Sequence, residues 1–118
     1  MREKNWPNFN RNLISKVGDI LNSGKINYTN GPFGKQFEYE FSKFTGNNYS
    51  IAICNGTVAL ELAIRSLNLP KNSEIIVSAR SFFSSASCII NTGHTPIFAD
   101  VDLLTQNISL DEIKKKNN

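Results

Sequence analysis

Residues 50–70, SIAICNGTVALELAIRSLNLP, decide the expected fold of the chain. The apolar residues 51–54 predict a short buried strand, and Asn55-Gly56-Thr57 predicts a tight turn. The residues after the turn are rich in Ala, Leu and Glu and place apolar side chains near helical spacing, which predicts a helix. Asn55 is a favourable N-cap, and Pro70 lies just past the expected end of the helix. Glu61 and Arg65 stand four apart in the order that favours an ion pair.

The turn between this strand and helix predicts an anion site. A helix start leaves unpaired N–H groups and the positive end of the helix dipole at one point, and a phosphate is the usual ligand there. Two alternatives stay open. Asn-Gly between apolar runs is also a hairpin signal, although the residues after it lack the alternation of a strand. Many strand-to-helix turns also bind nothing.

Length and composition indicate at most one small domain of a soluble globular protein. The chain has 118 residues, of which 40% are hydrophobic and 19% charged. The net charge of +3 owes much to Lys114, Lys115 and Lys116. Because no aromatic residues interrupt this run, it indicates a solvated helix face and not a nucleic-acid surface. The N-terminus lacks a signal-peptide pattern and no apolar run could span a membrane, so the cytoplasm is the expected location.

The two cysteines, Cys54 and Cys88, predict neither a disulfide nor a metal site. They form no CxxC pair and have no histidine cluster nearby. Both stand in apolar segments, where cysteine acts as a small hydrophobic residue.

The rest of the chain alternates helices with short apolar runs. Helices are expected over residues 10–21, 35–45 and 84–91, with a last one after Ser109, and strands over residues 74–77 and 96–99. Phe37, Phe41 and Phe44 form an aromatic stripe that predicts core packing. The loop at residues 25–34 is either an ordinary connector or a segment that reaches a binding site.

This order predicts βαβ units and a mainly parallel sheet flanked by helices. With the strand at residues 51–54, the sheet would have about three strands, fewer than the usual four to six. The pattern therefore indicates the opening of a larger α/β domain.

Four landmarks closely resemble the start of the DegT/DnrJ/StrS family of sugar aminotransferases, which use pyridoxal 5'-phosphate (PLP). They are FEYEFSKFTG (residues 37–46), CNGTVALELAI (54–64), SEIIVSARSFFSSAS (73–87) and GHTPIFADVDLLTQNIS (93–109). The resemblance implies the N-terminal part of the large domain of a type I PLP-dependent transferase, similar to aspartate aminotransferase and incomplete here. Residues 1–33 would be an N-terminal helix and loop, and residues 34–118 the start of the PLP-binding domain.

The resemblance also implies roles for individual residues. Gly56 and Thr57 would hold the PLP phosphate, and Phe82 would stack on the pyridine ring, although taken alone Phe82 would suggest core packing. Asn55 stands where the family often has Ser and would keep a capping role at the cofactor site. The lysine that binds PLP covalently, and the acid that pairs with the pyridinium nitrogen, lie beyond residue 118 in the family. No catalytic residue is therefore expected within this chain.

Two positions near these landmarks have expected surface roles. His94 stands where the family usually has a small residue and is expected to be an exposed loop side chain. Arg80 is expected at the surface, with contact to a substrate anion as the alternative.

The implied activity is transfer of an amino group from an amino acid, commonly glutamate, to a keto-sugar nucleotide. Such enzymes serve cell-surface polysaccharide or amino-sugar biosynthesis, usually as homodimers, without nucleic-acid or membrane partners. Two alternatives remain: a non-catalytic truncated fragment, and a PLP-dependent sugar dehydratase of the same fold. The 118 residues alone are expected to be inactive.

Overall fold

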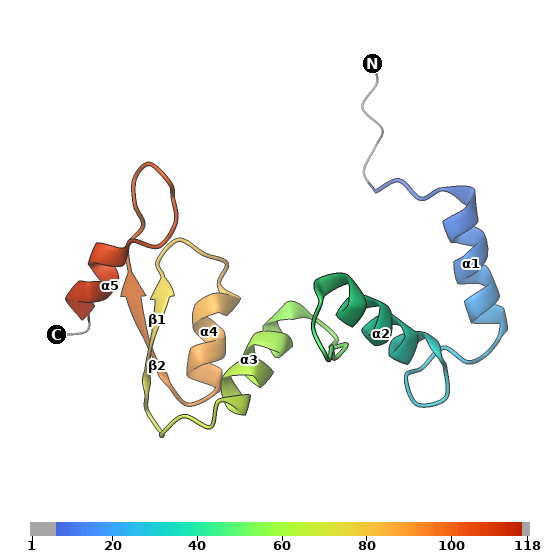
Figure 1. The fold of residues 1–118 in the computed structure, drawn as a ribbon, viewed down its shortest axis with the longest axis horizontal. Helices are drawn as coiled ribbons and strands as arrows, with labels where there is room; N and C mark the ends of the chain where they lie inside the picture. The colour runs from blue at the N-terminus through green and yellow to red at the C-terminus, as the bar shows by residue number, and fades with distance from the viewer. Residues whose placement is uncertain (1–6, 117–118) are drawn as a thin grey trace, which may run out of the picture. The chain divides into compact units, whose positions relative to one another are not determined.

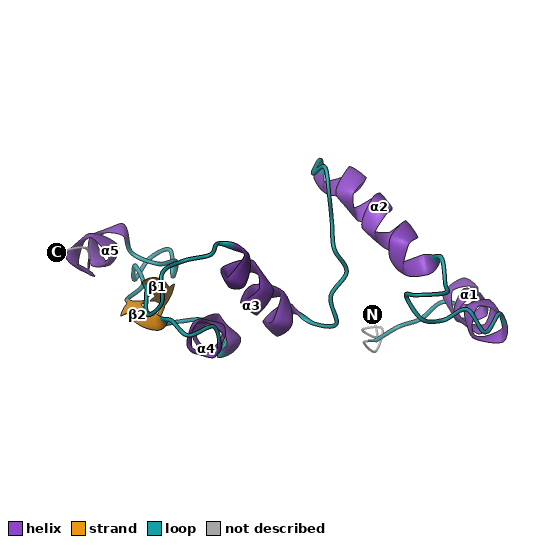
Figure 2. Ribbon diagram, turned by 90° about the horizontal axis from the view of Figure 1, so that it is seen from below, coloured by secondary structure: helices purple, strands orange, loops and turns teal. Residues whose placement is uncertain are grey.

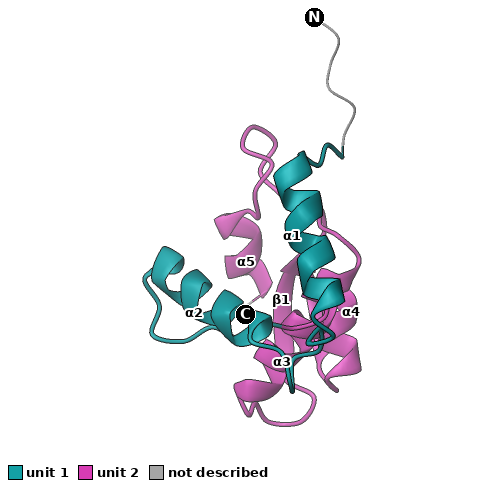
Figure 3. Cartoon of the chain, turned by 90° about the vertical axis from the view of Figure 1, so that its right-hand side faces the viewer, with its two compact units in different colours: residues 1–52 teal, residues 53–118 magenta. Residues whose placement is uncertain are grey.

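The computed structural model describes residues 7–116, and the chain forms two compact units, residues 1–52 and 53–118 (Figures 1 and 3). The N-terminal stretch that lacks a signal-peptide pattern, residues 1–10, lies partly outside the described residues, which begin at residue 7. The expected division of the chain into an N-terminal helix and loop (residues 1–33) and the start of a larger domain (residues 34–118) stays a prediction.

The first unit contains helices α1 (Arg11–Asn22) and α2 (Phe33–Thr45). Asn10 caps α1, since its Oδ1 accepts a 2.8 Å hydrogen bond from the N–H of Leu13. α2 ends at Gly46, whose φ of 71° lies in the left-handed region that glycine adopts without strain. Both helices confirm the sequence prediction to within two residues at each end.

The loop between α1 and α2 folds back on itself and on α2. The N–H of Gly31 donates to the carbonyl of Asn27 at 2.9 Å, and a Cβ at Gly31 would collide with the carbonyl oxygens of Lys25 and Asn27. The hydroxyl of Tyr28 donates a 2.9 Å hydrogen bond to Glu38 on α2, which raises the pKa of Tyr28. These contacts hold the loop against itself and against α2.

The prediction that the phenylalanine stripe of α2 packs in a core is wrong. Phe37, Phe41 and Phe44 are 58%, 46% and 87% exposed. The helical spacing was predicted correctly, and the rings of Phe37 and Phe41 lie 5.7 Å apart. Burial, however, requires a second apolar surface over the stripe, and none of the described residues provides one.

The second unit contains α3 (Gly56–Ser66), β1 (Glu74–Ser78), α4 (Ser84–Asn91), β2 (Thr95–Ala99) and α5 (Leu110–Lys116). β1 and β2 pair in parallel, with Ile76 opposite Ile97, and α4 connects them as a βαβ unit. α4 packs on both strands, α3 packs on α4, and α5 contacts β2 (Figures 1 and 2). The predicted parallel α/β pattern is confirmed for this part of the chain.

The predicted strand at residues 51–54 does not form, so the described residues contain a sheet of two strands and not three. A strand is stabilised by hydrogen bonds to a neighbouring strand. Here the N–H of Ala52 donates instead to the carboxylate of Glu38 at 2.8 Å, and Ile51 is 73% exposed. Ala52 is therefore bonded to a side chain of α2 and not to a neighbouring strand.

The buried core of the second unit lies where α4 meets the strands. Among the described residues, the buried apolar side chains are Cys88, Ile89 and Ala99. Cys88 confirms its predicted role as a small hydrophobic residue, whereas Cys54 is exposed because the strand that would bury it is not formed. No group of three or more potential metal ligands occurs in residues 7–116. Within that range no helix has both the length and the apolar character to cross a bilayer.

The C-terminal helix α5 begins as predicted. The hydroxyl of Ser109 accepts a hydrogen bond from the N–H of Glu112 at 3.4 Å. Lys114 lies 3.9 Å from Asp111, and Lys115 pairs with Glu112, whose hydrogen bond raises the pKa of Lys115. All three lysines are exposed, which confirms a solvated helix face.

Candidate functional site

The start of α3 has two main-chain N–H groups available for a ligand. The Oδ1 of Asn55 accepts from the N–H of Val58 at 3.0 Å, and the carbonyl of Asn55 accepts from Ala59 at 3.1 Å. The predicted cap is therefore present. The N–H groups of Gly56 and Thr57 precede these two, and no acceptor for them occurs among the described residues. Unpaired groups at this position are what an anion binds.

A second helix starts beside the first. α4 begins at Ser84, which is 6% exposed, after a turn that carries Phe82. The carbonyl of Phe82 accepts a 2.9 Å hydrogen bond from the N–H of Ser85, and the hydroxyls of Ser81 and Ser85 lie 2.7 Å apart. Two contacts with Ser85 therefore fix the turn that carries Phe82, while the ring of Phe82 is 77% exposed.

The starts of α3 and α4 share one cavity of about 550 Å³. We call it the helix-start cavity; its lining residues are Gly56, Thr57, Ala59, Leu60, Phe82, Ser84 and Ser85. The structure thus brings together Gly56, Thr57 and Phe82, which were singled out from the sequence. Asn55 caps the helix beside the cavity but does not line it.

Sequence reasoning missed the contribution of Ser84 and Ser85. The helix that they begin was predicted with the correct limits, but its start was not connected with the anion turn at Gly56. The signal was available, since the helix starts of successive βα units lie at the same edge of a parallel sheet.

No ionisable side chain lines the helix-start cavity. Attraction for an anion therefore comes from N–H groups, from hydroxyls and from the dipoles of two helices. Such a site can bind and orient a ligand, but its own side chains include no acid or base with a pKa near neutrality.

Arg80 and His94 lie outside this cavity. Arg80 is exposed, as expected, and its N–H donates to the hydroxyl of Ser78 at 3.2 Å. The prediction of an exposed His94 is wrong, because the side chain is half-buried and its Nδ1 is shielded from solvent. Gly93 has a φ of 83°, and this turn lets the N–H of His94 bond to the carbonyl of Ile89 at 3.0 Å, which draws the side chain toward the end of α4.

Comparison with known proteins identifies the family of this chain. The model of the DegT/DnrJ/EryC1/StrS aminotransferase family matches residues 7–117. The chain belongs to this family. The spore coat polysaccharide biosynthesis protein SpsC of Bacillus subtilis (strain 168) is 39% identical over 102 residues, which cover 86% of this chain and 26% of SpsC.

Solved structures of family relatives share the fold. An aminotransferase from Psychrobacter cryohalolentis superposes with a TM-score of 0.89 at 38% identity, over 95% of this chain and 28% of that protein. The E. coli GDP-4-keto-6-deoxy-D-mannose-3-dehydratase, solved with hydrated PLP, superposes at 0.81 with 28% identity, over 91% of this chain and 28% of the dehydratase. The predicted fold class, part of a PLP-dependent transferase fold, is confirmed. The chain spans little more than a quarter of the length of these relatives.

Proposed function

We propose that the protein carrying this chain is a PLP-dependent aminotransferase that moves an amino group from an amino acid to a keto-sugar nucleotide. Glutamate is the donor that the family resemblance implies. The observation that carries the proposal is the helix-start cavity, where two helix starts and the exposed Phe82 ring meet in a member of this family. SpsC supports a place in polysaccharide biosynthesis, and the dehydratase relative is named for a keto-sugar nucleotide.

The phosphate of PLP fits the start of α3. Gly56 does not have a positive φ, and a Cβ built on it has no neighbour within 4 Å. Neither the backbone conformation nor internal packing therefore requires glycine at this position. A ligand that approaches the main chain closely does require it. The hydroxyl of Thr57 would add a hydrogen bond to the phosphate.

The pyridine ring of PLP fits beside Phe82. An exposed aromatic ring at the edge of a cavity offers a flat apolar face, and the hydrogen bonds at Ser85 fix the main chain that carries it. Stacking of two aromatic rings contributes about 0.5–1.5 kcal/mol beyond the burial of their area. In this proposal Gly56, Thr57 and Phe82 hold PLP at its two ends.

The cavity residues bind and orient, and the cofactor supplies the chemistry. PLP, when bound, withdraws electrons from the reacting carbon atom. Because no ionisable side chain lines the cavity, we infer that the residue that moves the proton lies elsewhere in the full protein. The 118 residues by themselves are then inactive. The proposal also includes a cytoplasmic location and a homodimer, both of which rest on the sequence expectations above.

A sugar dehydratase is the second candidate, supported by the structural match to the PLP-bound dehydratase. The test supplies the full protein with PLP, glutamate and a GDP-linked keto-sugar, and follows the sugar by mass spectrometry and the amino acid by its keto-acid product. Amination of the sugar with an equal amount of 2-oxoglutarate supports the aminotransferase. Loss of water from the sugar supports the dehydratase. A protein that retains no PLP and changes neither substrate contradicts both.

A further inference from the structure

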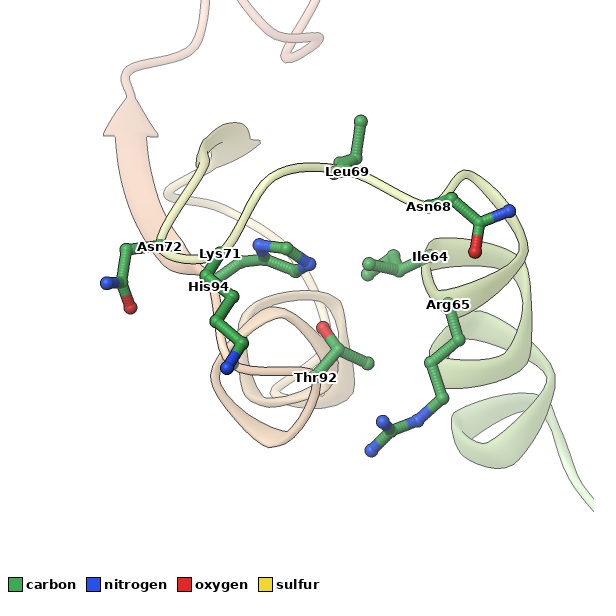
Figure 4. Close-up of a pocket in the computed structure, with 9 residues that line it drawn as sticks. Ile64, Arg65, Asn68, Leu69, Lys71, Asn72, Thr92 and His94 are labelled. Carbon is green, nitrogen blue, oxygen red and sulfur yellow. The ribbon is translucent and has the colours of Figure 1, made fainter.

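A second hollow lies at the opposite ends of the same two helices (Figure 4). It has a volume of about 500 Å³, and we call it the helix-end hollow. Its lining residues are Ile64, Arg65, Asn68, Leu69, Lys71, Asn72, Thr92, Gly93 and His94. None of them is a carboxylate, while Arg65 and Lys71 are basic side chains. No residue is shared with the helix-start cavity.

The two cations line the same hollow. The Nη2 of Arg65 donates a 3.0 Å hydrogen bond to the carbonyl of Asn91, which fixes one edge of the guanidinium. Lys71 takes part in no ion pair within the described part of the chain. In Figure 4 the side chains of Arg65 and Lys71 extend in the same direction, on either side of Thr92.

Basic residues near helix ends often serve only to neutralise the last carbonyl groups. Here the carbonyls at the end of α4 already have donors. Cys88 accepts from the N–H and the hydroxyl of Thr92 at 3.2 and 2.8 Å, and Ile90 accepts from Gly93 at 2.9 Å. At the end of α3, the carbonyl of Ile64 accepts from Leu67 at 3.1 Å. The charge of Lys71 is therefore not needed to complete these ends.

His94 is a further polar side chain that lines this hollow. Its imidazole lies between Lys71 and Ile64 in Figure 4. The Nδ1 atom is buried and has no hydrogen-bond partner among the described residues. Because solvent does not reach this atom, the proposal for a ligand in the hollow does not rest on it.

We propose that the helix-end hollow binds a phosphate-bearing anion. The free N–H groups of a fixed guanidinium and an ammonium group on the same hollow suit the oxygens of a phosphate group. The hollow lies within the range of about 300–1,000 Å³ found for small-molecule sites, so it has room for a phosphate ester as well as for phosphate alone. This site is separate from the cofactor cavity and does not depend on the proposed enzymatic function.

The test is protection of Lys71 from acetylation in the full protein, loaded with PLP so that the helix-start cavity is filled and then freed of excess PLP, which is itself a phosphate ester. Pyrophosphate is the probe, acetic anhydride the reagent, and peptide mass spectrometry gives the rate at each lysine. Acetylation of Lys71 should slow about tenfold once pyrophosphate reaches roughly ten times its dissociation constant. Lys114, on the exposed face of α5, is the internal control and should keep its rate.

Two comparisons make the result decisive. Arg65→Gln should abolish the protection of Lys71, whereas Lys114→Gln, which makes the same change in net charge, should leave it intact. Sodium chloride at matched ionic strength should give no protection. Equal slowing of Lys71 and Lys114, the same slowing by chloride, or an unchanged Lys71 rate in the wild-type protein would each overturn the proposal.

Discussion

The side-chain amide of Asn91 on α4 donates a 2.7 Å hydrogen bond to the carboxylate of Glu61 on α3. The main-chain carbonyl of the same asparagine accepts from Arg65, so one residue joins α4 to two successive turns of α3. The alignment of these helices determines whether their starts meet in the helix-start cavity. The bonds at Asn91 therefore position the candidate site from its far end.

Glu61→Ala should lower the free energy of unfolding of the full protein by roughly 0.5–1.5 kcal/mol, the usual net value of one hydrogen bond. The loss arises because the amide of Asn91 then has no partner on α3. Urea denaturation measures it. Glu61→Gln keeps an acceptor oxygen and should restore most of the stability; equal loss in both variants would show that this hydrogen bond is not the cause.

Thr57→Val should weaken PLP binding by about 1.5–3 kcal/mol, the value of a hydrogen bond to a charged group. The shape of the side chain is kept, so the melting temperature of the PLP-free protein should not change. Equilibrium dialysis measures the PLP affinity. Thr57→Ser retains the hydroxyl and is the matched control. Unchanged affinity in Thr57→Val would rule out the role assigned to this hydroxyl.

Gly56→Ala should reduce PLP affinity without harm to the fold. The added methyl group meets no atom of the chain within 4 Å, and Ala has a higher helix propensity than Gly by about 1 kcal/mol in a helix interior. It would, however, occupy the space in front of the N–H groups of α3. A thermal melt and a PLP titration on the same sample separate the two effects. If stability fell while PLP affinity held, the glycine would have a structural role instead.

Phe82→Ala should loosen PLP and shift its absorbance band, whereas Phe83→Ala should do neither. The two neighbouring rings are 77% and 78% exposed, but only Phe82 lines the helix-start cavity. Both substitutions remove a similar exposed surface, so the pair isolates stacking on the cofactor. Parallel PLP titrations of the two variants provide the measurement. Similar effects from both would argue against a specific stack at Phe82.

The 118 residues expressed alone should form no covalent PLP adduct, show no aminotransferase activity and melt without a sharp cooperative transition. In the described part, the buried apolar side chains are only Cys88, Ile89 and Ala99, while Ile51 and Phe98 are 73% and 52% exposed. So small a core barely offsets chain entropy, and the open strand edges invite association. Borohydride reduction with mass spectrometry tests the adduct, and calorimetry tests the melt. A single-lysine adduct with turnover, or a sharp melt of a soluble monomer, would contradict these expectations.

The sequence by itself determined the local features of this protein. The Asn55 cap, the limits of α4 and the left-handed end of α2 at Gly46 each depend on hydrogen bonds between residues a few positions apart. Apolar runs separated by a short helix were sufficient to predict the parallel pair β1 and β2, because few other connections are sterically open to such a pattern.

Tertiary structure decided which of these local features meet. Glu61 and Arg65, spaced for an ion pair with each other, both bond to Asn91, and no ion pair between them occurs in the described part. Glu38 takes the N–H of Ala52 that a strand would have used. Ser84 and Ser85 join Gly56 and Thr57 in one cavity. These partners lie 14 to 30 residues apart, and a contact over that separation depends on the packing of whole helices and not on hydrogen bonds between residues a few positions apart.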